Sequence, residues 1–412
     1  MVGGRMRGLL QWVVAAGCLA VLLCGCGDTS FLAPRDPVTI RFAFPGDNSF
    51  YDPLIAEFQD QHKNVTIELV QSNYFYYRGQ SEEYQYDVAL IPQFLLPGLI
   101  EEQDVISLNA LISEDGDLSM DDFYAGAADV MTIQGQTYAI PYLADMAVMV
   151  YNRDLFDKYA VPYPELDWTR DEFLECAKSL THEDVGEYGY AYQQVGGQSG
   201  LAELMLLVYQ NGGRFFDDLS NPTRMVFNEP LNVEAMQWYA DLIHLHKVAP
   251  QPGRRPMPYP GAGIDGGKYA MWIGYLGDDW DDLNVGIAPL PRARNAVTTG
   301  MVLGLVISPE TRDAQASWEW VSYISSQAPP GLMPTRRSVA ESDAVDRVLP
   351  PEAVAVGRAS LPNLISFNIS FDGQLGKTWG IAMQAYNTAV ARIQNGDPVQ
   401  AALDEAQEKS GF

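Results

Sequence analysis

Asp145 is the residue whose surroundings most suggest chemistry. It is the only charged side chain in the seventeen residues from Gln136 to Asn152. A carboxylate in such an apolar stretch either lies at the surface where a strand ends or serves a site, because a buried charge is costly unless it is paired. In a site, its two oxygens can accept hydrogen bonds from neighbouring hydroxyl groups. The pattern alone favours the surface position.

Two apolar segments must position Asp145. Residues 137–140 follow a glycine turn and are typical of a short strand, and Pro141 then lacks the backbone donor that strand pairing needs. Residues 147–151 form a second apolar run, of strand length. Asn152 can cap a helix that continues through Leu155 and Phe156. The predicted order is therefore strand, a break that carries Asp145, strand and helix.

Patterns typical of enzymes are weak. The chain has four histidines, and His244 and His246 diverge on a helix, which makes them a poor metal pair. No nucleophile elbow or phosphate-binding glycine loop occurs. The acidic stretches 115–122 and 278–282 could bind calcium, but solvated loops explain them more simply. Paired carboxylates for a glycoside hydrolase remain possible among 53 acidic residues, so a membrane-anchored hydrolase is an alternative.

Length and charge narrow the class of protein. A chain of 412 residues favours two domains. The net charge of −27 argues against nucleic acid and against an anionic membrane surface as partners.

The N-terminus resembles an export signal. Arg5 and Arg7 precede an apolar run at residues 9–23, which is shorter than a membrane span. The run ends in Leu23-Cys24-Gly25-Cys26, a pattern of bacterial lipoproteins in which residues 1–25 are removed and Cys26 is acylated. Residues 26–37 would then link the lipid to the folded chain outside the cytoplasm. Acylation at Cys18, or an ordinary cleaved signal, is the alternative.

The mature chain begins with alternating strands and helices. We expect strands at 38–44, 65–70 and 88–91, with a helix at 51–62. This order predicts a mostly parallel sheet, whose ligands gather where strands end. The loops after these strands carry Asp47, Tyr74 and Gln93.

A second α/β unit follows residue 152. The stretch from 169 begins with a capping box formed by Thr169 and Glu172. The pattern further predicts helices at 169–180, 201–210, 233–246, 311–325, 376–395 and 398–409, and strands at 285–288 and 302–307.

The segment around Asp145 resembles the crossover of extracellular solute-binding proteins of ABC importers, in the sugar-binding family that includes maltose-binding protein. The resemblance covers nearly the whole mature chain. Its other motifs are Tyr86–Ile91, Asn211-Gly212-Gly213, Gly267–Met271, Ala288–Pro291 and Leu332–Arg337. The family commonly has Gly, any residue and Trp after Met271, whereas here Tyr275 follows Gly274 and the next tryptophan is Trp280.

The resemblance implies an α/β fold of the two-lobed, type II periplasmic-binding-protein class, each lobe a mixed sheet flanked by helices. Lobe one would hold 38–142 and 285–326, and lobe two 143–284 and 327–412. A monomer would capture a sugar or oligosaccharide between the lobes and deliver it to permease subunits, without catalysis or cofactor. A non-sugar solute, such as a glycerol phosphodiester, is the alternative.

The resemblance also implies where the solute binds. Asp145 lies where the family often places a sugar-binding carboxylate, and Trp379 where it often stacks an aromatic ring. Sugars need aromatic faces and planar polar groups. The predicted ligand-binding residues are Asp47, Tyr74, Gln93, Asp145, Tyr275, Trp280 and Trp379.

Overall fold

The computed structural model describes most of the chain beyond the predicted signal and linker. The described residues are 36–45, 48–71, 85–192, 198–217, 224–251, 267–279, 283–367 and 373–410. The predicted signal peptide and Cys26 lie outside them. Within these ranges, no helix combines the length and the apolar character that a membrane span requires.

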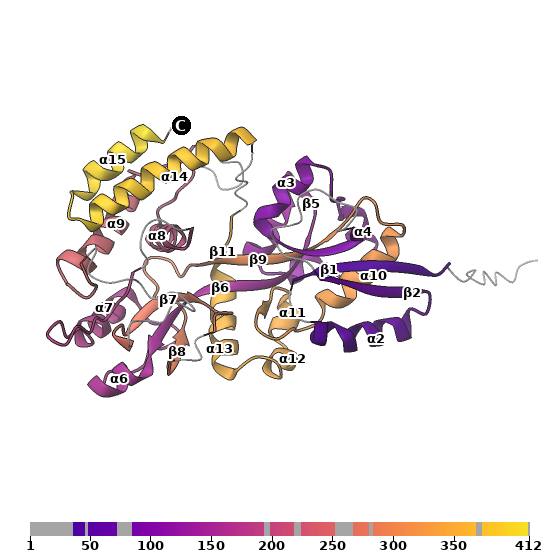
Figure 1. The fold of residues 1–412 in the computed structure, drawn as a ribbon, viewed down its shortest axis with the longest axis horizontal. Helices are drawn as coiled ribbons and strands as arrows, with labels where there is room; N and C mark the ends of the chain where they lie inside the picture. The colour runs from indigo at the N-terminus through magenta and orange to yellow at the C-terminus, as the bar shows by residue number, and fades with distance from the viewer. Residues whose placement is uncertain are drawn as a thin grey trace, which may run out of the picture.

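A mixed sheet runs through the molecule, with β6 and β9 side by side at its centre (Figure 1). Its strand order is β10-β6-β9-β3-β1-β2, β7 and β8 also pair with β6, and β11 pairs with β9. β1 is parallel to β2 and β3, whereas β6 is antiparallel to β7, β8, β9 and β10. The strands are β1 (Val38–Phe44), β2 (Val65–Gln71), β3 (Val88–Pro92), β6 (Ile140–Asn152), β7 (Met271–Tyr275), β8 (Val285–Ala288), β9 (Thr298–Ile307), β10 (Met333–Pro334) and β11 (Leu364–Ile365), with a separate hairpin of β4 (Thr132–Ile133) and β5 (Gln136–Thr137).

Helices cover the sheet along its length. α2 lies beside β2, and α10 packs on β1, β6 and β9. The helices are α2 (Tyr51–Gln61), α3 (Leu96–Glu101), α4 (Asn109–Glu114), α5 (Ala125–Val130), α6 (Arg153–Tyr159), α7 (Arg170–Ser179), α8 (Gln198–Gln210), α9 (Pro230–His244), α10 (Ala314–Ser325), α11 (Arg337–Ala340), α12 (Asp343–Asp346), α13 (Pro351–Ser360), α14 (Gly373–Gln394) and α15 (Val399–Lys409).

The predicted break around Asp145 is wrong, because β6 is one strand of 13 residues. Pro141 pairs with Gly304 of β9, and the register shifts between Pro141 and Leu143. Such an irregularity accommodates a residue that cannot donate to the ladder. Asp145 therefore lies inside a continuous strand, opposite Met301.

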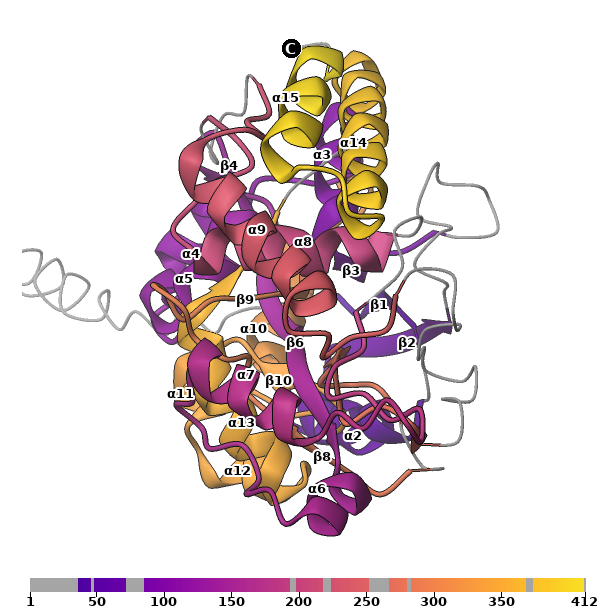
Figure 2. The same cartoon turned by 90° about the vertical axis from the view of Figure 1, so that its left-hand side faces the viewer.

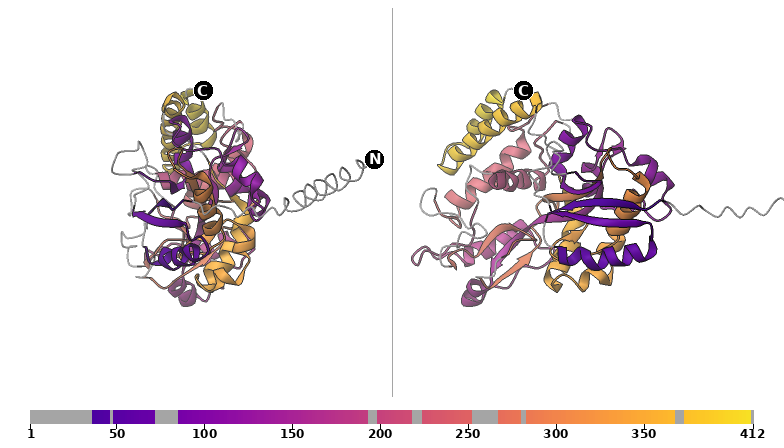
Figure 3. Two further views of the ribbon diagram at one scale, coloured as in Figure 1. Left: turned by 90° about the vertical axis from the view of Figure 1, so that its right-hand side faces the viewer. Right: turned by 45° about the vertical axis from the view of Figure 1, so that its right-hand side comes forward.

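β6 joins two hydrophobic cores. Its first half packs with β1, β3, β9 and α10 into the first core, which includes Phe42, Leu305 and Trp320. Its second half packs with α7, α8, α9, α14 and α15 into the second core, which includes Tyr239 and Tyr386. Figure 3 (right) shows α14 and α15, in yellow, apart from the indigo strands of the first core. The fold is thus α/β and two-lobed. The first core comprises two buried clusters, and a further cluster around β6 contains Val148, Val150, Tyr269, Trp272 and Val356.

Candidate functional site

Three segments pass from one core to the other, and together we call them the crossing: Asp145–Ala147, Thr298–Met301 and Leu364–Phe367. In β6, Met146 belongs to the first core and Ala147 to the second. Thr298 ties β9 to β6 at this level, since its hydroxyl donates to the Ala147 carbonyl at 2.7 Å. Leu364 lies in the first core, whereas Phe367 packs against the second. Asp145 is therefore placed where the two cores meet.

The Asp145 carboxylate is half-buried at the crossing. Its Oδ1 accepts a hydrogen bond from the Gly277 amide at 3.0 Å. Burial, helped by the nearby charge of Asp278 and opposed by the Gly277 hydrogen bond, raises the pKa of this carboxyl group to about 6. One backbone donor does not saturate two carboxylate oxygens, so the group can accept more hydrogen bonds.

The turn after β7 brings a second carboxylate to Asp145. The Leu276 amide donates to the Met146 carbonyl at 2.9 Å, which fixes the turn beside β6. Asp278 accepts from the Tyr275 amide at 2.8 Å, and burial raises the pKa of Asp278 as well. Tyr275 is half-buried, pairs with Ala147 and packs against the second core.

Gln93 lies on the other side of β9 and ties its neighbours together. Its Oε1 accepts from the Val302 amide at 2.8 Å, and its Nε2 donates to the Ser366 hydroxyl at 3.0 Å. Ser366 in turn donates to the Gly300 carbonyl at 2.9 Å. The buried Gln93 amide thus links the end of β3 to two segments of the crossing. Its role in ligand binding stays a prediction.

The structure brings Gln93, Asp145 and Tyr275 to the crossing. Asp47, Tyr74 and Trp280 lie outside the described residues, and so does the side chain of Trp379, whose backbone lies in α14. The sequence analysis missed two residues here. Ser366 has no local signal, because its partner Gln93 is 273 residues away. Asp278 appeared only as part of an acidic loop, although its position three residues after Tyr275 could have indicated it.

Possible metal ligands can be located among the described residues. No cluster of three or more histidine, cysteine, aspartate or glutamate side chains is placed there to hold a metal ion. In the acidic stretch 115–122, Asp115 accepts hydrogen bonds from the Trp318 indole at 2.7 Å and from two backbone amides. That carboxylate therefore closes a loop.

Known proteins resemble this chain in sequence. The family described as "Bacterial extracellular solute-binding protein" matches residues 45–329. The arabinooligosaccharide-binding protein of Halalkalibacterium halodurans is 26% identical over 290 residues, which is 66% of this chain and 59% of that protein. The aligned part thus spans less than two thirds of that relative.

Solved structures resemble it in fold. The cyclic alpha-maltosyl-1,6-maltose binding protein from Arthrobacter globiformis gives a TM-score of 0.73 at 18% identity, covering 91% of this chain and 98% of that one. The sugar-binding protein MalE from Xanthomonas citri gives 0.72 at 17% identity, covering 91% and 96%. The family match extends over more than half of the residues, and the predicted resemblance is confirmed: the chain belongs to the bacterial extracellular solute-binding protein family.

Proposed function

We propose that this protein captures a sugar or oligosaccharide at the crossing and delivers it to the permease of an ABC importer. The observation that carries the proposal is the Asp145 carboxylate, which is half-buried where the two cores meet and, among the described residues, is bound by one backbone amide. Adjacent sugar hydroxyls supply the hydrogen bonds that such a group lacks. The names of related proteins, which bind arabinooligosaccharide and cyclic alpha-maltosyl-1,6-maltose, support a carbohydrate.

The two lobes close on the solute. A ligand shifts an equilibrium only if it binds one state better than the other. Closure would bury Asp145 more deeply, so hydroxyl groups that pair with it stabilise the closed form.

The core packing supports lobes slightly different from the predicted ranges: Met333–Leu364 contributes to the first core, and Ala288 and Leu290 to the second.

The protein acts as the solute-binding component of the importer. Its family is one of binding proteins, and energy for transport comes from the partner ATPase, so no catalytic step or cofactor is needed. It acts as a monomer, held outside the cytoplasm by a lipid on Cys26, which keeps it near the permease.

A sugar panel tests the proposal. Thermal unfolding with mono-, di- and oligosaccharides, polyols and a glycerol phosphodiester should reveal at least one carbohydrate that raises the Tm, without turnover of that sugar. Asp145→Asn should weaken its binding at least tenfold, whereas the control Asp129→Asn, at an exposed position of α5, should not. A response to the phosphodiester alone, hydrolysis of a glycoside, or intact affinity in Asp145→Asn would each contradict the proposal.

A further inference from the structure

α13 is built into the first lobe. Val354 lies in the first core, and Arg358 ties the end of the helix to the α11–α12 segment. The Arg358 guanidinium donates to the Ala340 carbonyl at 2.9 Å and to the Ser342 carbonyl at 3.0 Å. It also pairs with Asp346 at 3.1 Å. A rotation of the first lobe therefore carries α13 with it.

Glu352, in the first turn of α13, is bound by the second lobe. Its Oε2 accepts from Arg153 Nη2 at 2.6 Å, and its Oε1 accepts from the Tyr151 hydroxyl at 3.2 Å and from the Ile287 amide at 3.3 Å. Arg153 begins α6, Tyr151 belongs to the second core and Ile287 lies in β8. One carboxylate of the first lobe thus receives hydrogen bonds from three elements that pack with the second.

An apolar contact continues this junction along the helix. Val356 of α13 clusters with Val148 and Val150 of β6 and with Trp272 of β7. Figure 2 shows α13 in the lower part of the molecule, together with α6, β8 and α12. We call this set the α13 junction: Glu352 and Val356 with Val148, Val150, Tyr151, Arg153, Trp272 and Ile287.

The α13 junction and Asp145 lie on opposite faces of β6. Successive side chains of a strand point to opposite faces, and the irregularity in β6 lies before Leu143. Val148 and Val150, which cluster with α13, are each an odd number of positions from Asp145. The Asp145 side chain therefore points away from α13.

A rotation about the crossing that brings the lobes together on one face separates them on the other. In the proposed function the solute binds on the Asp145 face, so closure over it moves α13 away from α6 and β8. The contacts of Glu352 must then lengthen or break. We propose that the α13 junction holds the lobes open in the empty protein and thereby lowers the affinity for sugar. This inference rests on the proposed function, which places the solute beside Asp145.

The charge of the Glu352–Arg153 pair can be changed without disturbing the rest of the junction. The two side chains are 39% and 31% exposed, so salt screens their attraction. A pair of this kind shifts the equilibrium between open and closed lobes by about two- to fivefold. In Glu352→Gln the amide oxygen can still accept from Tyr151 and Ile287, so the variant removes the charge and retains the shape.

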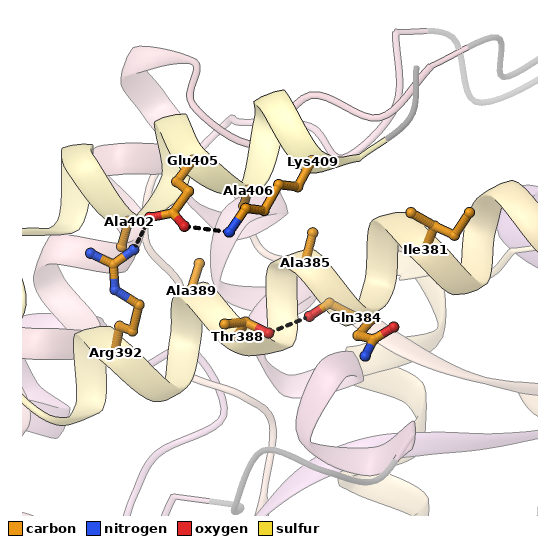
Figure 4. A pocket seen from close by; sticks show the side chains of 10 residues that line it. All are labelled: Ile381, Gln384, Ala385, Thr388, Ala389, Arg392, Ala402, Glu405, Ala406 and Lys409. Carbon is orange, nitrogen blue, oxygen red and sulfur yellow. Dashed lines mark hydrogen bonds and ion pairs between the residues drawn. The ribbon is translucent and has the colours of Figure 1, made fainter.

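An ion pair inside the second lobe supplies the matched control (Figure 4). Glu405 of α15 pairs with Arg392 of α14 and with Lys409. Glu405 is 44% exposed, close to the 39% of Glu352. Both helices pack into the second core, so rotation of the lobes leaves these pairs unchanged. Glu405→Gln therefore removes an ion pair of the same kind without affecting the α13 junction.

Calorimetric titration with the sugar identified in the panel tests the inference. Glu352→Gln should bind that sugar about two- to fivefold more tightly than the parent, and Glu405→Gln should bind it as the parent does. High ionic strength should raise the affinity of the parent towards that of Glu352→Gln, because salt screens the pair. Unchanged or weaker binding by Glu352→Gln would overturn the proposal.

Fluorescence energy transfer in the empty protein separates this inference from the proposed function. Dyes on Asp129→Cys of α5 and Gln400→Cys of α15, both exposed positions, report the distance between the lobes in mature chains that lack other cysteines. The fraction of molecules in the compact state should rise in Glu352→Gln and not in Glu405→Gln. Equal distributions in Glu352→Gln and the parent would exclude the junction as a restraint on closure. A shift in Glu352→Gln while no sugar binds the parent would support the restraint and contradict only the proposed function.

Discussion

At the scale of single residues, the surroundings of Asp145 disfavour the ionised form of its carboxyl group. The pKa of this carboxyl group in the folded protein is about 6, against an ordinary value of 3.8. Folding therefore favours the protonated form. The contribution of Asp145 to stability is most favourable below about pH 4 and is lost as the pH rises through about 6, so that ionisation costs about 2–3 kcal/mol at neutral pH.

Asp145→Asn should remove this cost. The amide oxygen can still accept from Gly277, and no charge is buried. We expect the free energy of unfolding of the empty protein to rise by up to about 2 kcal/mol at pH 7.5, and to change little at pH 4. Urea unfolding at both pH values measures this. An equal effect at both pH values, or a loss of stability at pH 7.5, would show that the charge has a stabilising partner.

Trp379 is a second residue with a testable role. It lies near the start of α14, and the resemblance assigns it a stacking role. Loss of a stacking ring should weaken affinity by roughly 1–3 kcal/mol in Trp379→Ala, while Trp379→Phe should retain most of the binding. Titration of both variants with the sugar identified in the panel measures the contribution of Trp379 to affinity. Equal affinity of Trp379→Ala and the parent would remove Trp379 from the site.

Sequence can draw attention to a residue that contrasts with its neighbours, and the ligand role of such a residue stays a prediction. Asp145 could be singled out because it is the one charge in an apolar stretch. The Gln93–Ser366 contact could not, because only the folded sheet brings these residues together. The Glu352–Arg153 pair escaped notice for the same reason, because its residues lie 199 positions apart in the chain.

At the scale of elements, local signals were reliable and long-range pairing was not. Asn152 caps α6 and Thr169 with Glu172 forms the capping box of α7, as predicted, because capping depends on residues only a few positions apart. β6 is continuous because it pairs with β9, which lies about 150 residues later in the chain. The local sequence does not reveal this pairing, so the prediction that Pro141 ends the strand was wrong. α13 was not predicted at all.

Close contact of β6 and β9 at the crossing gives an element-scale prediction. A methyl group on Gly300 would lie 2.3 Å from the Asp145 carbonyl oxygen. Gly300→Ala must therefore push the two strands apart, and we expect a loss of about 1–3 kcal/mol in the free energy of unfolding, together with weaker sugar binding. Urea unfolding and titration measure the two effects.

Gly380→Ala is the matched control. A methyl group there meets nothing within 4 Å, and the position is exposed on α14. In a helix, alanine should be more stable than glycine by about 0.5–1 kcal/mol. If Gly300→Ala were as stable as the parent while Gly380→Ala behaved as expected, the strand contact at the crossing would not be as tight as described.

At the scale of the whole molecule, the first prediction concerns how the protein is attached to the membrane. If Cys26 carries the lipid, Cys26→Ser should release the protein from the membrane fraction of cells, because the anchor is lost while the fold is untouched. Fractionation followed by immunoblotting measures the distribution, with Cys176→Ser as the control cysteine. Membrane retention of Cys26→Ser equal to that of the parent would exclude this anchor and leave Cys18 as the alternative.

The second question is closure. Among the described residues, the three segments of the crossing join the two cores, and α13 also packs across them, because Val356 clusters with Val148 and Trp272 and Glu352 contacts Arg153 at 2.6 Å. Rotation of one lobe against the other must therefore shift these α13 contacts. The ligand can drive this rotation only through contacts that differ between the open and closed forms. In the proposed function Asp145 is a group of this kind, because closure would remove its remaining water and leave the ligand hydroxyls to pair with it.

Small-angle X-ray scattering can follow that rotation. With saturating sugar the parent and Asp129→Asn should contract, and the radius of gyration should fall. At the same sugar concentration, Asp145→Asn should remain extended, because the bonds that favour closure are weaker. If the parent binds sugar stoichiometrically and keeps its radius of gyration, the lobes do not close. Asp145 would then contribute affinity without shifting the conformation.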